Sequence, residues 1–244
     1  MVHFMYNIGG CYMNKVVLVI SDLHIPYHHK DSFAFLKEVK KVFKPDTVIN
    51  IGDLLDFHAI SMHDSDPDLP SPGNELSIAR QYIRELESVF PDVTEVHSNH
   101  SSLVYRRAIK YGMSREFLRP YADFLGTKKW KWVDDVTLKL SNGERVHFTH
   151  GKSADVLKVS QAMGMSAVQG HYHTKFSIGY WANPDRLYWG MQVGCLINQK
   201  SLAFSYAKNF STRFILGCGI IIDGVPRLLP MVLNNRGDWI GTVV

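Results

Sequence analysis

The chain has 244 residues, of which 45% are hydrophobic and 20% are charged, and its formal net charge is +4. No run approaches the roughly 18 apolar residues of a membrane helix, and the first residues lack the pattern of a signal peptide. The three cysteines, Cys11, Cys195 and Cys218, are too few and too widely spaced for a disulfide framework or a Cys-based zinc site. We therefore expect a cytoplasmic protein without a membrane partner.

Strands and amphipathic helices alternate in the first half of the chain. Apolar runs and helical spacing predict strands over 15–20, 47–51 and 93–98, and helices over 31–43, 74–90 and 101–111. Asp31 is expected to cap the first helix. The order strand, helix, strand indicates a right-handed parallel crossover. Residues 63–73 are acidic and rich in proline, which predicts a surface loop.

The second half favours strands. The dipeptide Asn142-Gly143 predicts the turn of a hairpin over 134–150. A short helix is expected over 154–163, and further strands over 166–170, 187–193, 202–206 and 218–222. No internal repeat and no change of composition marks a linker. The sequence thus predicts an N-terminal extension over 1–14 and a single α/β domain over 15–244.

Polar residues follow five of the apolar runs, where each strand is expected to end. In chain order they are Asp22, His24, Asp53, Asp56, Asn99, His100, His150, His171 and His173. The carboxyl ends of strands share one edge of an open α/β sheet, so these side chains are expected to converge. Asp22 and His24 are two residues apart, as are His171 and His173, so in extended backbone each pair points to one side.

The donor atoms of this set are carboxylate, amide and imidazole, without thiolate. Such donors suit manganese, iron or zinc better than calcium. They outnumber the four ligands of one tetrahedral site, whereas two ions that share a carboxylate would use them. A pair of metal ions is a known solution for displacement at phosphorus. We expect two divalent ions, with manganese favoured over iron, zinc, nickel and magnesium.

The ordered motifs DLH (22–24), GDLLD (52–56), SNHS (98–101), His150 and GHYH (170–173) resemble those of the calcineurin-like metallophosphoesterase superfamily. The resemblance covers about residues 15–175. It implies a two-sheet β-sandwich flanked by helices, an αββα arrangement with the metals at the sheet edge. By position it implies one metal held by Asp22, His24 and His173, a bridging Asp53, and a second metal held by Asn99, His150 and His171.

The resemblance also implies a mechanism. A hydroxide that bridges both metals would attack phosphorus in line, and His100, oriented by Asp56, would protonate the leaving oxygen. The sequence departs from the family at two positions, because Ser98 replaces the usual Gly and Ser101 replaces the usual acid. Neither position supplies a metal ligand, so metal binding is expected to survive with altered surroundings.

The substrate is left open. Basic residues concentrate just after His100, and they form either a solvated helix face or a platform for phosphates. We expect a phosphodiester or nucleic-acid-type substrate, with contacts from Arg106, Arg107 and His58. The alternatives are a phosphomonoesterase acting on nucleotides or phosphoproteins, and a non-catalytic scaffold of the same fold. The oligomeric state is not predicted.

Overall fold

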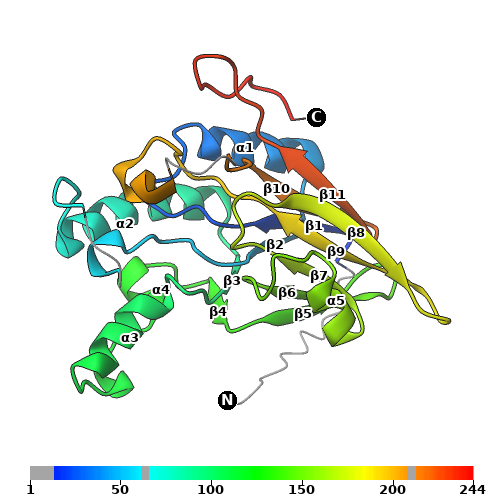
Figure 1. Ribbon diagram of the computed structural model, residues 1–244, viewed down its shortest axis with the longest axis horizontal. Helices are drawn as coiled ribbons and strands as arrows, with labels where there is room; N and C mark the ends of the chain where they lie inside the picture. The colour runs from blue at the N-terminus through cyan, green and yellow to red at the C-terminus, as the bar shows by residue number, and fades with distance from the viewer. Residues whose placement is uncertain (1–13, 62–65, 208–212, 244) are drawn as a thin grey trace.

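The computed structural model describes residues 14–61, 66–207 and 213–243. Two sheets lie face to face between helices (Figure 1). The first sheet has six strands, and β1 to β4 run parallel while β10 pairs antiparallel with β1. In spatial order these strands are β11 (Val225–Pro230), β10 (Gly217–Ile222), β1 (Val16–Ile20), β2 (Thr47–Asn50), β3 (Thr94–Val96) and β4 (Lys131–Val133).

The second sheet has five strands and packs on the first through an apolar layer. Its spatial order is β5 (Val136–Lys139), β6 (Arg145–Thr149), β7 (Ser166–Gln169), β9 (Leu187–Val193) and β8 (Phe176–Ala182). Alternate residues of β1 and β2, such as Val17, Val19 and Ile49, meet Phe148 and Val168 of the second sheet in this layer. Alternation along buried strands therefore builds the interior of the sandwich.

Helices cover the outer faces of both sheets. On the six-stranded sheet, Leu18 and Ile20 of β1 belong to a second core with Phe35 and Leu36 of α1 (Ser32–Phe43) and Ile83 of α2 (Pro72–Val89). On the other sheet, α5 (Lys158–Met163) packs against β7 and β9. The shorter elements are η1 (His58–Ile60), α3 (Ser102–Lys110), η2 (Arg115–Phe117), α4 (Tyr121–Leu125) and η3 (Leu202–Ala207). This arrangement confirms the predicted α/β sandwich.

Some local predictions are wrong. The segment predicted as a strand over 202–206 is the 3-10 helix η3, because the Ser201 carbonyl accepts the N–H of Phe204 and the Ser201 hydroxyl accepts that of Ala203. A short apolar run does not by itself separate strand from helix. Within the described residues Asp31 makes no side-chain cap bond, and its carboxylate instead accepts the N–H of Trp239.

Three strands were not predicted, namely β4, β8 and β11. β11 contains Pro226 and ends at Pro230, which argues against a strand, but it lies at the edge of its sheet, where proline is tolerated. The Asp223-Gly224 turn before it has positive φ angles of 49° and 85° and is a hairpin signal in the sequence. That dipeptide is the clue that would have predicted β11.

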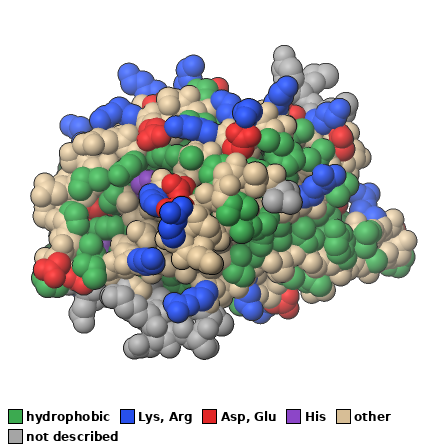
Figure 2. Space-filling model, turned by 90° about the horizontal axis from the view of Figure 1, so that it is seen from above, with side chains coloured by type: hydrophobic (Ala, Val, Ile, Leu, Met, Phe, Trp, Pro, Cys, Tyr) green, Lys and Arg blue, Asp and Glu red, His purple; other side chains and the backbone are tan. Residues whose placement is uncertain are grey.

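The surface differs between the two ends of the molecule. Figure 2 shows hydrophobic side chains gathered over the end where β8 and β11 lie, with Lys and Arg scattered around the rest of that face. Among the described helices, none is long and apolar enough to cross a membrane. Nearly all of the predicted N-terminal extension, residues 1–13, lies outside the described residues, and Asn14 forms a bridge with Leu140.

Candidate metal centre

The predicted donor residues converge in the loops that follow β1, β2, β3, β6 and β7. They form three groups in which potential ligand atoms lie within 4.8 Å of one another. Because the five strands end at the same edge of the sandwich, donors far apart in sequence meet there. The groups are Asp22, His24, Asp53 and His173; His24, Asp56 and His100; and Asp53, His150 and His171.

The two carboxylate oxygens of Asp22 have different surroundings. Oδ2 accepts hydrogen bonds from the Ser21 hydroxyl and from the main-chain N–H of His171, the latter at 2.9 Å. Oδ1 lies 3.0 Å from Nε2 of His173 and 3.8 Å from Nε2 of His24. Oδ2 is therefore held by hydrogen bonds within the protein, and Oδ1 faces the imidazoles of His173 and His24.

Asp53 connects the first group with the third. Its Oδ1 accepts the main-chain N–H of His100 at 3.3 Å. Its Oδ2 lies 3.4 Å from Nε2 of His24 and 3.2 Å from Nε2 of His150. One buried carboxylate oxygen thus stands between imidazoles of two groups, as a bridging ligand would.

His150 is held in one tautomer. Its Nδ1–H donates to the carbonyl of Ile51 at 2.9 Å, so in the neutral ring the lone pair lies on Nε2. That nitrogen lies 2.8 Å from Oδ1 of Asn99 and 3.2 Å from Nδ1 of His171. Donor atoms of three residues therefore point at a common position, and a main-chain contact of the kind that supports metal-binding histidines fixes the central one.

The surroundings of His24 fit a cation. Its Nδ1 lies 2.6 Å from Oδ1 of Asp56, while its Nε2 is buried and has no hydrogen-bond partner among the described residues. The unpartnered nitrogen faces the carboxylates of Asp22 and Asp53. A buried polar atom without a partner is costly, and a metal ion among these atoms would remove that cost. These residues fit divalent metal ions.

The electrostatics point the same way. Burial raises the pKa of Asp53, yet the histidines around it, His150 foremost, hold that pKa well below its ordinary value. Burial lowers the pKa of His150, but the charge and hydrogen bond of Asp53, the charge of Asp22 and the hydrogen bond to Ile51 together raise this pKa to about 9. The pKa of His171 is lowered by burial and by the neighbouring His150. The buried carboxylates thus favour a positive charge at this position. A proton and a metal ion compete for the same imidazole nitrogens.

The backbone at the site differs from the predicted extended pairs. Asp22, His24, Asp53 and His171 have φ angles of 53°, 49°, 49° and 70°. Each such left-handed conformation costs a non-glycine residue on the order of 1 kcal/mol or more, so the surrounding contacts must maintain it. Convergence therefore depends on sharp turns at the strand ends, where the prediction had side chains alternating along a strand.

Gly52, the residue before Asp53, is required by the packing. Its φ is +105°, and an added Cβ would lie 2.7 Å from Nδ1 of His150 and 2.8 Å from Cβ of Ser98. Any larger residue would displace the candidate ligand His150. The glycine of this motif thus permits the close approach of two loops.

Ser98 and Ser101, the departures from the family pattern, stabilise each other. The Ser101 hydroxyl accepts the main-chain N–H of Ser98 at 2.7 Å, and the Ser98 hydroxyl accepts that of Ser101 at 3.1 Å. The turn closed by these bonds carries Asn99 and His100. The serines therefore fix the presentation of the two residues between them.

His100 and Asp56 contact each other differently from the expectation. The Nδ1–H of His100 donates to the main-chain carbonyl of Asp56, and the Asp56 carboxylate lies 3.8 Å from that nitrogen. The carboxylate makes its close contact with His24 instead. The side chain of His100 is 25% exposed, so its ring reaches the surface beside the exposed Asn99, while Asp22, His24, Asp53 and His150 are buried.

The three predicted substrate contacts have different surroundings. Arg106 is exposed on α3. The guanidinium of Arg107 donates to the carbonyls of Ile60 and Ser61, so it holds the loop of η1. Nδ1 of His58 lies 3.8 Å from Oδ2 of Asp56, at the border of the site. Nε2 of His58 accepts the main-chain N–H of Asp66 at 3.2 Å, so His58 and Arg107 are both engaged by the protein, whereas the side chain of Arg106 is exposed.

Two aromatic residues near the histidines were not predicted as part of the site. The ring centroid of Phe204 lies 5.4 Å from that of His24, and the ring of Phe214 lies 5.2 Å from that of His173. Both arrangements are edge-on. Such rings limit the freedom of the imidazoles. Neither phenylalanine belongs to a sequence motif, so only the structure shows that they lie beside the histidines.

Glu75 was also missed. It lies in the first turn of α2, and its carboxylate accepts the main-chain N–H groups of His58 and Ala59 at 3.0 Å each. Burial and the charge of Asp56 raise the pKa of Glu75 to about 7, although these hydrogen bonds lower it. A buried acid thus supports the loop that carries His58.

Glu75 should make the stability of the protein depend on pH. Its folded pKa of about 7 exceeds the ordinary value of 4.5, so the folded state binds more protons between these values. The free energy of unfolding should then fall as the pH rises from 5 to 8, by on the order of 2 kcal/mol from this group. Urea titrations of the wild type and of Glu75→Gln should show a smaller fall in the variant. Glu85→Gln, an exposed position of the same helix, should retain the full fall.

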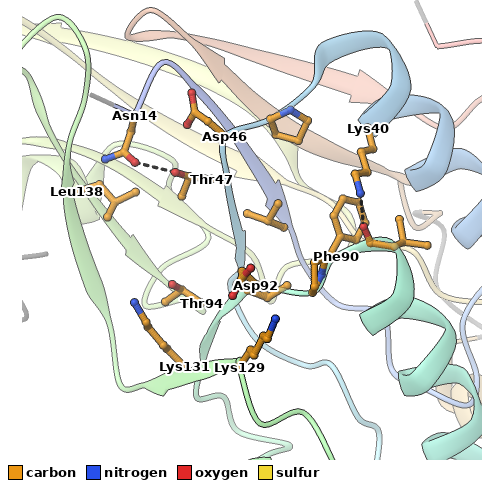
Figure 3. A pocket seen from close by; sticks show the side chains of 15 residues that line it. Asn14, Lys40, Asp46, Thr47, Phe90, Asp92, Thr94, Lys129, Lys131 and Leu138 are labelled. Atoms are coloured by element: carbon orange, nitrogen blue, oxygen red, sulfur yellow. Dashed lines mark hydrogen bonds between the residues drawn. The ribbon is translucent and has the colours of Figure 1, made fainter. Parts of the chain in front are cut away.

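A cavity of about 410 Å³ lies elsewhere (Figure 3). It is lined at the amino ends of β2 and β3, and residues around it include Thr47, Phe90, Lys129 and Lys131. Ligands of open α/β sheets bind at the carboxyl ends of strands, where the donor groups meet. The cavity therefore does not belong to the candidate metal centre.

Comparisons with known proteins identify the family. The model of the calcineurin-like phosphoesterase family matches residues 15–188. The Gene 54 protein of Mycobacterium phage L5 is 26% identical over 260 aligned positions, which cover 90% of this chain and 95% of that protein.

Among solved structures, Vps29 of Chaetomium thermophilum is similar with a TM-score of 0.51 and 12% identity, over 96% of this chain and 95% of that one. A phosphodiesterase from an archaeon has a TM-score of 0.49 and 16% identity, over 88% of this chain and 99% of that one. The structural likeness to Vps29 agrees with the sandwich described above. Since the family model spans most of the sequence, the chain belongs to the calcineurin-like phosphoesterase family.

Proposed function

We propose that this protein is a phosphodiesterase that depends on two divalent metal ions and acts on nucleic-acid-type substrates. The observation that carries the proposal is the position of Asp53 Oδ2, 3.4 Å from Nε2 of His24 and 3.2 Å from Nε2 of His150. A single carboxylate oxygen shared by two donor groups supports a two-metal site.

The residues divide between the ions as follows. Asp22, His24 and His173 would hold one ion, Asn99, His150 and His171 the other, and Asp53 both. Bound there, the ions supply an activated water nucleophile and neutralise charge that develops on the phosphate. The mixture of imidazole and oxygen donors favours manganese. Asp56 keeps His24 oriented through the contact of 2.6 Å between its carboxylate and Nδ1.

His100 is the proposed proton donor. Its Nδ1–H is engaged by the carbonyl of Asp56, so Nε2 is the ring nitrogen left to meet a substrate. In the imidazolium form, that nitrogen donates its proton to the oxygen of the leaving group. The partial exposure of the ring matches this role, because the leaving group departs toward solvent.

A diester is favoured over a monoester by the surface next to the site. The helix that follows His100 is basic, with Arg106 and Lys110 exposed on it. A polyanionic chain gains more from such a surface than a small phosphomonoester does. A monoesterase acting on nucleotides or phosphoproteins is the competing function.

A hydrolysis screen with manganese tests the proposal. The substrates are an aryl phosphomonoester, an aryl phosphodiester, cyclic nucleotides, and single-stranded and double-stranded DNA. We expect turnover of the aryl diester and of DNA, and loss of turnover when a chelator removes the metal. Faster turnover of the monoester would favour the competing function. Bound metal without turnover of any substrate would contradict catalysis.

A further inference from the structure

A basic and aromatic segment projects beside the candidate site. It comprises α3 and η2, residues 102–119, and is called the arm below. Figure 1 shows it standing out from the body of the molecule at the lower left. Residues 109–117 of the arm are all exposed. These residues bury little of their surface, so packing against the rest of the protein does not account for the kinds of side chain found there.

The arm exposes large apolar residues. Tyr111 is 74% exposed and Phe117 is 73% exposed, and Ile109 and Met113 beside them are also exposed. Single exposed apolar residues are common, whereas a group of them on one projection marks an interaction surface. Two flat rings dominate this group.

The charge of the arm is positive. Arg106, Lys110, Arg115 and Arg119 are exposed, and Glu116 is the one acidic residue in the sequence of the arm. The guanidinium of Arg115 lies 3.8 Å from the ring centroid of Tyr105, a cation–π contact that holds it on the surface. The partner of the arm is therefore expected to be anionic.

The arm is joined directly to the site. α3 begins two residues after His100, and its nine residues rise about 14 Å, which matches the length of about four stacked nucleotides. A chain whose phosphate lies at the metal centre could therefore follow the arm to Tyr111. Small phosphate esters are too short to reach it.

We propose that the arm binds an unpaired nucleic-acid strand, with bases stacked on Tyr111 and Phe117 and phosphates paired with Arg106 and Lys110. This inference rests on the proposed function and names the substrate class of the same site. Exposed rings among cations are typical of surfaces that bind single strands without sequence preference. An acidic protein would use the charges but not the flat rings. Two copies of the arm would repel each other, since both are positive.

Fluorescence anisotropy with the full chain tests the proposal without catalysis. The probe is a labelled single-stranded oligodeoxynucleotide of about 16 nucleotides, mixed with the metal-free protein. We expect Tyr111→Ala and Phe117→Ala each to raise the dissociation constant at least about fivefold, the factor for one lost stack. Arg106→Ala should reduce the slope of log K against log salt by about 0.7. Tyr180→Ala, an exposed ring on β8, should change neither value.

Three results would overturn the inference. They are wild-type affinity in both ring variants, equal binding of a blunt duplex, and a dimer that Tyr111→Ala dissociates without any change in oligonucleotide affinity. Failure of the inference is distinguishable from failure of the proposed function. If the protein hydrolyses the aryl diester but does not bind the oligonucleotide, only the proposed role of the arm is contradicted. A protein that binds the strand through the arm and hydrolyses no ester contradicts only the catalysis.

Discussion

Asp53→Asn is expected to remove at least one metal ion per chain and to lower turnover by more than the roughly 10–100-fold that follows loss of a partner behind a metal ligand. Oδ2 of Asp53 lies 3.4 Å from Nε2 of His24 and 3.2 Å from Nε2 of His150, which belong to different groups. An amide –NH₂ in its place brings a hydrogen-bond donor, which satisfies those nitrogens and excludes a cation. Its oxygen still accepts the N–H of His100, so the fold should be retained.

Elemental analysis after dialysis measures the bound metal directly. A thermal melt gives a second measure, because an ion that binds only the folded state raises the melting temperature. We expect manganese to stabilise the wild type more than Asp53→Asn. Asp123→Asn, at an exposed position of α4, is the matched control and should behave like the wild type. A variant that holds two ions with unchanged affinity would rule out the bridging role.

The fold was predictable where burial is uniform. β1 is a continuous, buried apolar run, and β2 follows the clear apolar stripe of α1 and runs into buried residues, so both strands stand out in the sequence. β8 was missed although its sequence, FSIGYWA, begins with an alternation of apolar and small residues. Its residues are partly or largely exposed along its length, so neither face of the strand is buried. β4 has three residues, too few for a pattern. Edge and short strands are defined by their partners, which the sequence does not reveal.

The site was predictable as a set of donors but not as an arrangement. Motif order singled out the residues that meet at the sheet edge. The left-handed backbone at Asp22 and His24 could not be predicted, since the surrounding loops impose it. The contact of Asp56 with His24, and that of Arg107 with the loop of η1, depend on how separate loops pack. Such contacts between distant segments carry no local signal.

The serine pair illustrates the same limit in a different way. From the sequence, Ser98 and Ser101 were departures whose effect was open. In the structure each hydroxyl accepts the N–H of the other residue, which closes the turn around Asn99. The capacity of serine to bond nearby main chain is general, but the reciprocal pairing requires the turn to exist first. A change that looked like a loss thus has a structural role.

His100→Ala is expected to lower the turnover of oligonucleotides by about 10²–10⁴-fold while metal content stays at the wild-type value. Its ring donates a hydrogen bond to a main-chain carbonyl, and His100 is not among the residues proposed to hold either ion. His100→Asn is the more specific test. Its amide can still donate a hydrogen bond to the carbonyl of Asp56, but it cannot transfer a proton to the leaving group. Both variants should therefore lose activity to a similar degree.

The leaving group separates proton donation from a structural role. An alkyl or nucleoside oxygen needs a proton in order to leave, whereas a nitrophenolate leaves readily without one. We expect both His100 variants to lose far more activity on an oligonucleotide than on an aryl diester, since only the first reaction requires the proton. An equal loss on both substrates would assign His100 to substrate positioning. Undiminished turnover of the oligonucleotide would refute the role of His100 as proton donor.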